Sequence, residues 1–248
     1  MAEPGNGVGF LPADWPAPET VRAGTTTRHG GASSGPWASL NLGERAGDDR
    51  KAVTENRRRL ATALRLPAAP AWLHQVHGAV VVDAAQGAGA QADAAVACAP
   101  GVVCAVLTAD CLPVLFCDRA GTRVAAAHAG WRGLAAGVLA ATVAALQTEP
   151  DELLAWLGPA IGPRAFEVGQ EVCAAFIERC REHALVFQPA DRPGQYHCDI
   201  YALARTELAA AGVTSVFGGG RCTHAESELF YSYRREAITG RMASLIWL

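Results

Sequence analysis

Three side chains that can bind a metal stand at or near the ends of apolar segments, far apart in the sequence. His77 lies in LHQVHG, Cys111 in VVCAVLTADCLPVLFCD, and His128 in RVAAAHAG. Positions at strand ends are held on a rigid frame and still meet solvent. Two imidazoles and one thiolate would leave a fourth position for water or substrate, which is the arrangement of catalytic zinc. Cys111 and His128 could equally act without a metal, as a nucleophile and its base. Residue types alone leave both interpretations open.

Asp110 stands beside Cys111 in the same apolar segment. A buried carboxylate without partners is strongly destabilising, so we expect Asp110 to meet hydrogen-bond donors or water. If it reached the same water as Cys111, it could also transfer a proton. We therefore predict Asp110, Cys111 and His128 as catalytic residues. The alternative for Asp110 is a structural carboxylate that caps a turn.

The segment HAGWRG at 128–133 could bind an anion on another side of this centre. Its glycines permit a close approach of the backbone, the expected helix start offers free N–H groups, and Arg132 adds a positive charge. We predict Arg132 as a phosphate ligand and Arg28, in TTRHGG, as a second one. The alternative is that Arg132 pairs with a surface acid while Trp131 packs in the core.

His74 precedes His77 by three positions. The following AVVVDA is rich in β-branched residues, which favours a strand across this region. Side chains three positions apart in a strand point to opposite faces. We therefore leave His74 out of the metal site and expect it on the opposite face, as a packing or surface residue.

The elements that must position these side chains alternate irregularly. A helix is predicted in GDDRKAVTENRRRLATALRLP, with Asp49 as its N-cap and Pro67 as its stop. Strands are predicted in 71–84, on both sides of the polar interruption in 102–118, and in 123–130, and further helices in 131–147, 168–183 and 200–211. Several adjacent strands favour a mixed-sheet α/β or α+β domain over a doubly wound parallel sheet. Neither a dinucleotide-binding nor a P-loop glycine motif opens any of these helices.

Composition narrows the possible partners. The chain has 248 residues, of which 50% are hydrophobic and 18% charged, and its formal net charge is -3. Its basic residues are scattered apart from RRR at 57–59, so we expect no nucleic-acid partner. Because no apolar run approaches the ~20 residues that span a bilayer and the N-terminus lacks a signal-peptide pattern, we expect a cytoplasmic protein without membrane contacts. The cysteines form no CxxC pair, and we expect most of them to be reduced and buried. No assembly motif is apparent, so we expect a monomer.

A set of segments, taken in order, closely resembles one known family. They are SLNLG (39–43), QVHG (75–78), TADCLPVLF (108–116), AAAHAGWRG (125–133), LGPAIGPRAFEVG (157–169), and FYSYRRE with TGRMAS (230–244). The family is the YfiH type, also labelled multicopper polyphenol oxidases or laccase-domain proteins, purine nucleoside phosphorylases and peptidoglycan editing factors. The resemblance extends from TTTRHGG at 25–31 to the C-terminus.

This resemblance implies a fold, a cofactor and an activity. The fold is a single α/β domain with mixed sheets, like that of cysteine-dependent deamidating toxins; we expect it to span 1–248, with 1–20 as a loosely ordered N-terminal segment. The implied cofactor is zinc, or else copper, bound by His77, Cys111 and His128. The implied activity is metal-dependent phosphorolysis of adenosine, inosine, guanosine and methylthioadenosine, together with deamination of adenosine. The partners would then be a purine nucleoside and phosphate.

Three other functions stand beside this one. A copper-dependent phenol oxidase matches one family label, but 7 histidines and 2 methionines are few for a multicopper centre. A Cys–His hydrolase of an amide or muropeptide-like substrate needs only Cys111, His128 and an oxyanion hole, and a bound zinc would inhibit it. A non-catalytic metal-binding module would leave the polar groups at the strand ends unexplained.

Overall fold

The computed structural model describes residues 7–248. Its strands form a four-stranded sheet (β1-β2-β13-β5), a six-stranded sheet (β12-β8-β6-β7-β4-β3) and a three-stranded sheet (β10-β11-β9). The strands are β1 Phe10–Pro12, β2 Arg22–Thr26, β3 Val81–Asp83, β4 Ala94–Ala97, β5 Val103–Thr108, β6 Leu112–Asp118, β7 Val124–Ala129, β8 Leu153–Leu157, β9 Glu167–Gly169, β10 Phe187–Pro189, β11 Gln195–Cys198, β12 Ser215–Gly218 and β13 Met242–Trp247. The α-helices are α1 Arg50–Leu64, α2 Trp131–Ala135, α3 Val138–Leu146, α4 Gln170–Ile177 and α5 Ile200–Ala210.

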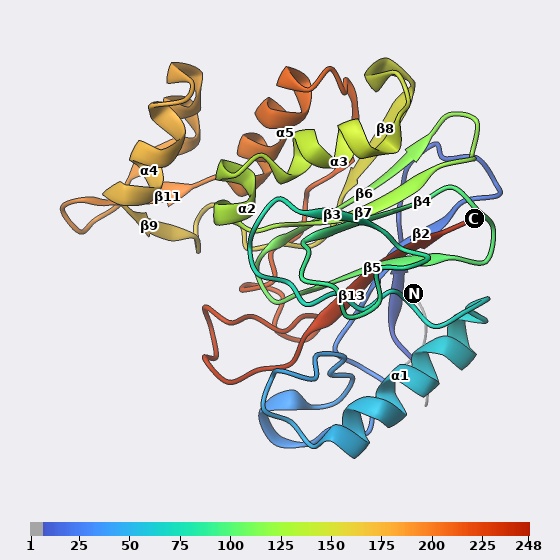
Figure 1. The fold of residues 1–248 in the computed structure, drawn as a ribbon. Coiled ribbons are helices and arrows are strands. Elements are labelled where there is room, and N and C mark those ends of the chain that lie inside the picture. The colour runs from blue at the N-terminus through green and yellow to red at the C-terminus, as the bar shows by residue number, and fades with distance from the viewer. Residues whose placement is uncertain (1–6) are drawn as a thin grey trace.

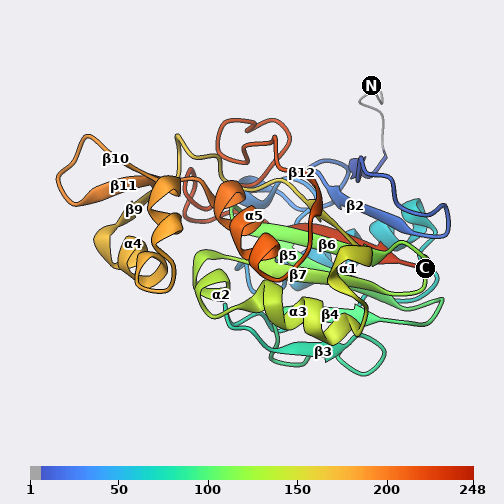
Figure 2. The same ribbon diagram turned by 90° about the horizontal axis from the view of Figure 1, so that it is seen from above.

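The two larger sheets are stacked, with helices outside both of them. Figures 1 and 2 show α2, α3 and α5 over the outer face of the six-stranded sheet, and α1 on the far side of the four-stranded sheet. The small sheet and α4 project at one end (Figure 1). Within the six-stranded sheet, β6 pairs antiparallel with β7 and β8, whereas β3 and β4 pair in parallel. The chain is therefore a single mixed α/β domain, which confirms the predicted fold class.

The layers follow from alternation along the strands. In β5, Val103 and Ala105 pack with Leu60 of α1, whereas Cys104 and Val106 face the space between the two sheets. Successive side chains of a strand point to opposite faces, so one strand contributes to two cores. A strand buried on both faces is apolar at nearly every position. For this reason the two apolar runs of 102–118, on either side of the polar interruption, form the sheet strands β5 and β6 and not a helix.

Two of the predicted helices are confirmed together with their caps. The Asp49 side chain accepts a hydrogen bond from the Lys51 amide at 3.0 Å at the start of α1. Asp199 caps α5 in the same way. The predicted helix over 131–147 is interrupted, because Gly137 adopts a left-handed φ of 84° and divides it into α2 and α3.

Three other sequence predictions are wrong in part. Of the predicted strand over 71–84, only Val81–Asp83 is regular, and the segment before it makes isolated bridges such as His74 with Gln91. Of the predicted helix over 168–183, α4 covers only Gln170–Ile177, followed by a 3-10 turn at Arg181–Val186. Within the N-terminal segment that we expected to be loosely ordered, β1 pairs with β2, while residues 1–6 lie outside the described residues.

All eight cysteines are free thiols, and half of them are buried, fewer than the majority that we expected. Burial raises the pKa of the Cys117 thiol to about 12, so it stays protonated. Cys111 differs, being only partly buried. Across residues 7–248, no helix has the length and apolar character needed to cross a bilayer.

Candidate metal centre

His77, Cys111 and His128 come together at one end of the six-stranded sheet. Their ligand atoms all lie within 4.8 Å of one another, and the two imidazole rings stand edge to face with centroids 4.8 Å apart. Cys111 immediately precedes β6, and His128 lies in the neighbouring β7, opposite Pro113. Antiparallel pairing therefore places the start of one strand beside the end of the next. His77 reaches them from the loop before β3, with a left-handed φ of 62°.

Asp93 fixes both histidines, and the sequence analysis did not identify it. Its side chain is completely buried, and Oδ1 lies 2.8 Å from Nδ1 of His128. The amides of His77 and Gly78 donate to the same carboxylate at 2.9 and 2.7 Å. A carboxylate on one ring nitrogen sets the tautomer and leaves the other nitrogen free to bind a metal. Nε2 of His128 is thus the nitrogen available to the centre.

The charges of this group stabilise one another. Burial alone would raise the pKa of Cys111, but the charge of His128 and hydrogen bonds from both histidines lower it to about 6. Burial alone would lower the pKa of His128, but the charges of Cys111 and Asp93 and the hydrogen bonds to them raise it to about 9. Burial would also raise the pKa of Asp93, which its hydrogen bonds instead hold below the ordinary value of 3.8. A thiolate is therefore available at neutral pH.

Gly130 supplies the space in which the three ligands meet. A Cβ at this position would lie 2.9 Å from Sγ of Cys111 and 3.3 Å from Cδ2 of His77. Its φ of -67° lies in the range of any residue, so the glycine serves close approach and not a special turn. This is the physical reason for the glycine that follows β7 in HAGWRG.

The ligand set fits a metal ion on chemical grounds. Two imidazoles and a thiolate are the donors that zinc and copper prefer, and the carboxylate behind His128 is the usual outer partner of such a ligand. The His/Cys/His site is thus present, with the tautomer of His128 set by Asp93 and the pKa of Cys111 lowered towards the thiolate form. Within residues 7–248 it is the single group of three or more His, Cys or acidic side chains close enough to share an ion.

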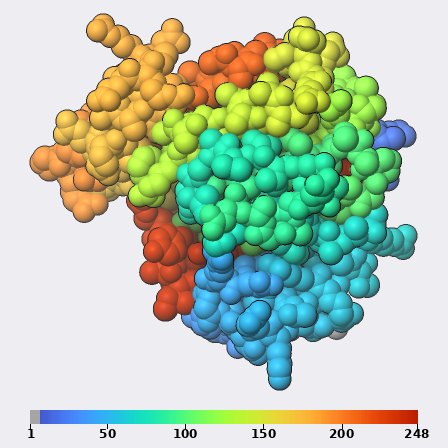
Figure 3. Space-filling view, viewed as in Figure 1, coloured from blue at the N-terminus to red at the C-terminus, as the bar shows by residue number. Residues whose placement is uncertain are grey.

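The centre opens into a cavity of about 610 Å³, whose wall includes all three ligands. This lies within the range of about 300–1,000 Å³ of small-molecule sites. Figure 3 shows the segments that contribute to it, namely the blue chain around residues 43–57, the teal chain around 72–89 and the red chain near the C-terminus, adjoining on one face.

Three guanidinium groups and two aromatic rings complete the wall, those of Arg45, Arg57, Arg241, Trp72 and Tyr233. The Cζ of Arg57 lies 4.3 Å from the centroid of Trp72. Burial lowers the pKa of Arg241, which the charges of Cys111 and Asp110 partly offset. The cavity thus combines aromatic surface with positive charge beside the ligand set.

Asp110 does not line the cavity. One carboxylate oxygen accepts a hydrogen bond from Oγ1 of Thr223 and the other from the amide of Arg234, both at 2.6 Å. Its backbone has a left-handed φ of 91°, an unusual conformation for a side chain of this kind. The expected hydrogen-bond donors are present. They hold the Asp110 side chain at the point where the backbone changes direction just before Cys111.

Neither guanidinium predicted as a phosphate ligand lies at the cavity. Nε and Nη1 of Arg28 donate to the carbonyl oxygens of Ala38 and Ser227, which hold its guanidinium among loops away from the cavity. Arg132 is exposed, with its Cζ 4.4 Å from the centroid of the Trp131 ring. The free N–H groups that suggested an anion site belong to α2, which has only five residues. Neither residue lines the cavity, and their binding of phosphate stays a prediction.

His74 also lies elsewhere than predicted. It lines the same cavity as His77, and its Nδ1 accepts a hydrogen bond from Nη2 of Arg45 at 2.8 Å. The opposite-face argument assumed a strand, but the segment is not a regular strand, and the chain bends at His77, whose backbone is in the left-handed region. His74 remains outside the ligand group, as expected.

Comparisons with known proteins find a matching family, similar sequences and a similar crystal structure. Residues 22–248 match the family described as multi-copper polyphenol oxidoreductase laccase. A purine nucleoside phosphorylase of Pseudomonas aeruginosa is 59% identical over 239 residues, covering 96% of this chain and 98% of that protein. The purine nucleoside phosphorylase YfiH of Escherichia coli is 56% identical, covering 94% and 96%. The crystal structure of a Neisseria meningitidis protein, 54% identical, superposes with a TM-score of 0.93 over 97% of this chain and 99% of that one.

Proposed function

The chain belongs to the multi-copper polyphenol oxidoreductase laccase family, of the YfiH type, and from this premise we propose that it cleaves purine nucleosides with phosphate. The substrates we propose are adenosine, inosine, guanosine and methylthioadenosine, with deamination of adenosine as a second reaction. The relatives named purine nucleoside phosphorylase match nearly the whole chain at 59% and 56% identity. The observation that carries the proposal is the His77–Cys111–His128 group in the wall of a cavity large enough for a nucleoside.

We propose zinc as the cofactor, with copper as the alternative, bound by His77, Cys111 and His128. A bound zinc ion acts as a Lewis acid and lowers the pKa of a water molecule in its open position. The chain's own contribution is to present the ligands ready to bind. The carboxylate of Asp93 holds His128 with Nδ1 protonated, and the thiol of Cys111 ionises at a pKa of about 6.

The remaining side chains of the wall suit a nucleoside. Trp72 and Tyr233 offer aromatic surface for a purine base. Asp110 was predicted to transfer a proton, but both of its oxygens accept hydrogen bonds from outside the cavity. We therefore propose that Asp110 acts as a positioning residue, which sets the backbone direction from which Cys111 projects.

A second candidate function is a Cys–His hydrolase, and one observation favours it. Asp93, His128 and Cys111 form a continuous series in which the carboxylate orients the imidazole and the imidazole activates the thiol. This is the arrangement of a nucleophile, its base and an orienting group. In such an enzyme, an ion bound to the thiolate would block catalysis.

Copper-dependent phenol oxidation, which the family description suggests, is a weaker candidate. A single three-ligand group in residues 7–248 contrasts with the further imidazoles that a multicopper centre requires. The axial methionine of an electron-transfer copper site is also missing from this group, since Sδ of Met242 accepts a hydrogen bond from the Tyr231 amide. Met1 lies outside the described residues.

One experiment separates these functions. The purified protein is analysed for zinc and copper, and then assayed with inosine and adenosine, with and without phosphate, before and after chelation. The matched variants are His77→Ala and His74→Ala, two histidines of the same cavity of which only one belongs to the ligand group. We expect the wild-type protein to release the base only when phosphate is present. Both His77→Ala and chelation should abolish this activity, and zinc added back to the chelated wild type should restore it. His74→Ala should retain its metal.

Other results would identify the alternatives. Activity that rises on chelation and disappears only in Cys111→Ala would establish the hydrolase and overturn the phosphorylase. Oxidation of phenols that requires added copper would establish the oxidase. The monomeric state and the cytoplasmic location stay predictions, and sedimentation measurements test the first of them.

A further inference from the structure

Arg241 presents a positive charge in the cavity without a carboxylate beside it. Its Nη1 donates to the carbonyl oxygens of Thr239 and Gly240, both at 2.9 Å. Among the side chains of residues 7–248, no acid lies within ion-pair distance of this guanidinium, and its Nε and Nη2 have no hydrogen-bond partner. A half-buried guanidinium anchored through one nitrogen has its remaining N–H groups available for a ligand.

Both the backbone and the side chain of Arg241 are held by contacts with the loop before α1. Its amide donates to Oδ1 of Asn41 at 2.9 Å, and the same oxygen accepts the amide of Gly43. Its carbonyl oxygen accepts the amide of Leu42 at 3.1 Å. The side chain then lies directly against Gly43, where a Cβ would come within 2.6 Å of its Cγ. Strand β13 and the loop before α1 are thus joined at the residue that carries the charge.

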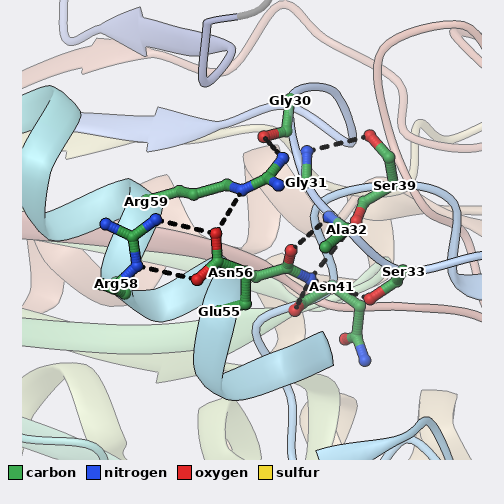
Figure 4. A network of polar contacts seen from close by, with 10 residues as sticks. All are labelled: Gly30, Gly31, Ala32, Ser33, Ser39, Asn41, Glu55, Asn56, Arg58 and Arg59. Atoms are coloured by element: carbon green, nitrogen blue, oxygen red, sulfur yellow. Dashed lines mark hydrogen bonds and ion pairs between the residues drawn. The ribbon is translucent and has the colours of Figure 1, made fainter. Parts of the chain in front are cut away.

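A buried hydrogen-bond network holds the loop before α1. Asn56 of α1 is completely buried, and its side chain bonds the amide of Ala32 and the carbonyl oxygens of Ser39 and Asn41 (Figure 4). Through Asn41, this network reaches Arg241. The guanidinium is therefore held in place before any ligand arrives, which reduces the entropy that binding would cost.

The charge balance of the cavity favours an anion. Arg57 is neutralised by Glu44, with Nη1 and Oε1 at 2.7 Å. Arg45 donates to Nδ1 of His74, and Arg241 only to carbonyl oxygens. Two guanidinium groups of the wall thus have no carboxylate within ion-pair distance among the described residues, and the charges of Cys111 and Asp110 offset that of Arg241 only in part. Arginine binds phosphate oxygens with short, charge-assisted hydrogen bonds, and two positive charges suit a dianion.

We propose that Arg241, held by Asn41 and Gly43 in the wall of the cavity that contains Cys111, binds the phosphate co-substrate. The site takes over the role that the sequence suggested for Arg132 and Arg28. Only the identity of the anion as a co-substrate rests on the proposed function; the anion site itself rests on the contacts of Arg241.

Equilibrium dialysis of zinc-loaded protein against radiolabelled inorganic phosphate tests this site directly. Arg241→Gln should weaken phosphate binding about 10- to 100-fold, since hydrogen bonds to a charged group are worth about 1.5–3 kcal/mol. Arg241→Lys should give an intermediate loss. Arg50→Gln, at an exposed position on α1, is the matched control and should bind as the wild type does. Zinc content should be unchanged in all of them.

Gly43→Ala offers a second route that leaves Arg241 in place. The added Cβ displaces the arginine side chain, so phosphate binding should weaken while the zinc content stays constant. Wild-type protein that binds no phosphate at millimolar concentration would overturn the proposal. So would unchanged binding in Arg241→Gln, or a loss of binding in Arg132→Gln.

The outcome is distinguishable from a failure of the proposed function. If bases are released without any need for phosphate while phosphate binding still depends on Arg241, the phosphorylase is refuted and the anion site stands. If Arg241→Gln keeps both phosphorolysis and the wild-type KM for phosphate, the anion site is refuted and the phosphorylase stands.

Discussion

Replacing Asp93 by asparagine tests whether one buried carboxylate organises the metal centre. Its Oδ1 accepts from Nδ1 of His128 and the amide of His77, and its Oδ2 from the amides of Gly78 and Val76. If the asparagine oxygen stays with the histidines, its NH₂ group faces the two other amides. Both of their hydrogen bonds are then lost in a site that water does not reach.

The expected size of the effect follows from these contacts. Losing the two bonds at Oδ2, each worth about 1.5–3 kcal/mol, should lower the free energy of unfolding by about 3 kcal/mol or more. Zinc affinity should fall about 10- to 100-fold, as it does when the outer partner of a ligand histidine is removed. Urea unfolding of metal-free protein measures the first effect, and competition with a colorimetric zinc chelator measures the second.

Asp118→Asn is the matched control. Asp118 is also buried and accepts hydrogen bonds from the amides of Thr122 and Arg123, but it ends β6, whereas Cys111 precedes the start of that strand. Along a strand this separation is roughly 20 Å. The control should lose stability and keep its zinc affinity. Wild-type zinc affinity in Asp93→Asn, or an equal loss in Asp118→Asn, would refute the assignment of Asp93.

Three other changes test the same centre. In metal-free protein, Cys111 should react with iodoacetamide at a rate that rises through about pH 6, because the thiolate is the reactive form. In His128→Ala the midpoint of this pH dependence should move up towards the ordinary thiol pKa of 9.0. An unchanged midpoint would contradict the ion pair between Cys111 and His128. Gly130→Ala should lower zinc affinity about tenfold or more in the chelator competition, because its Cβ would overlap Sγ of Cys111; retained affinity would mean that the loop shifts freely. Asp110→Asn should reduce kcat for inosine cleavage by less than about tenfold, with the zinc content unchanged, whereas His77→Ala should abolish it. A loss in Asp110→Asn as complete as that in His77→Ala would restore its predicted role in proton transfer.

The proximity of Cys111 and His128 could be predicted from the sequence because it follows from the pairing of two strands. Cys111 and His128 flank two apolar runs separated by a short turn, and antiparallel pairing of such runs brings those positions together. His77 could not be placed in this way, since its left-handed backbone lies in no regular element. The sequence singled out His77 only as an imidazole beside an apolar segment, and the family resemblance implied the same residue. The same departure from a strand explains why the predicted position of His74 was wrong.

The arginines could not be assigned for a different reason. A long side chain can turn towards several partners. The guanidinium of Arg28 reaches the carbonyl oxygen of Ser227, and the side chain of Arg241 lies against Gly43, in each case in a loop distant in the sequence. Asp93 was missed although it stands next to an apolar strand, as Asp110 does. Asp93 directly precedes β4, and Asp110 follows shortly after β5. A carboxylate next to a buried strand is a usable signal, but it does not reveal which histidine the carboxylate will meet.

The pairing of β13 implies that the metal-ligand group and Arg241 come into place at different stages of folding. His77, Asp93, Cys111 and His128 all come from one stretch of about fifty residues, so their assembly closes short loops. Arg241 joins Asn41 across a separation of 200 residues, and β13 must insert between β2 and β5 to bring it there. Contacts of such long range form slowly. We therefore expect His77, Cys111 and His128 to come together during folding before Arg241 joins Asn41, and a local opening of β13 in the native state to move Arg241 while leaving the His/Cys/His group in place.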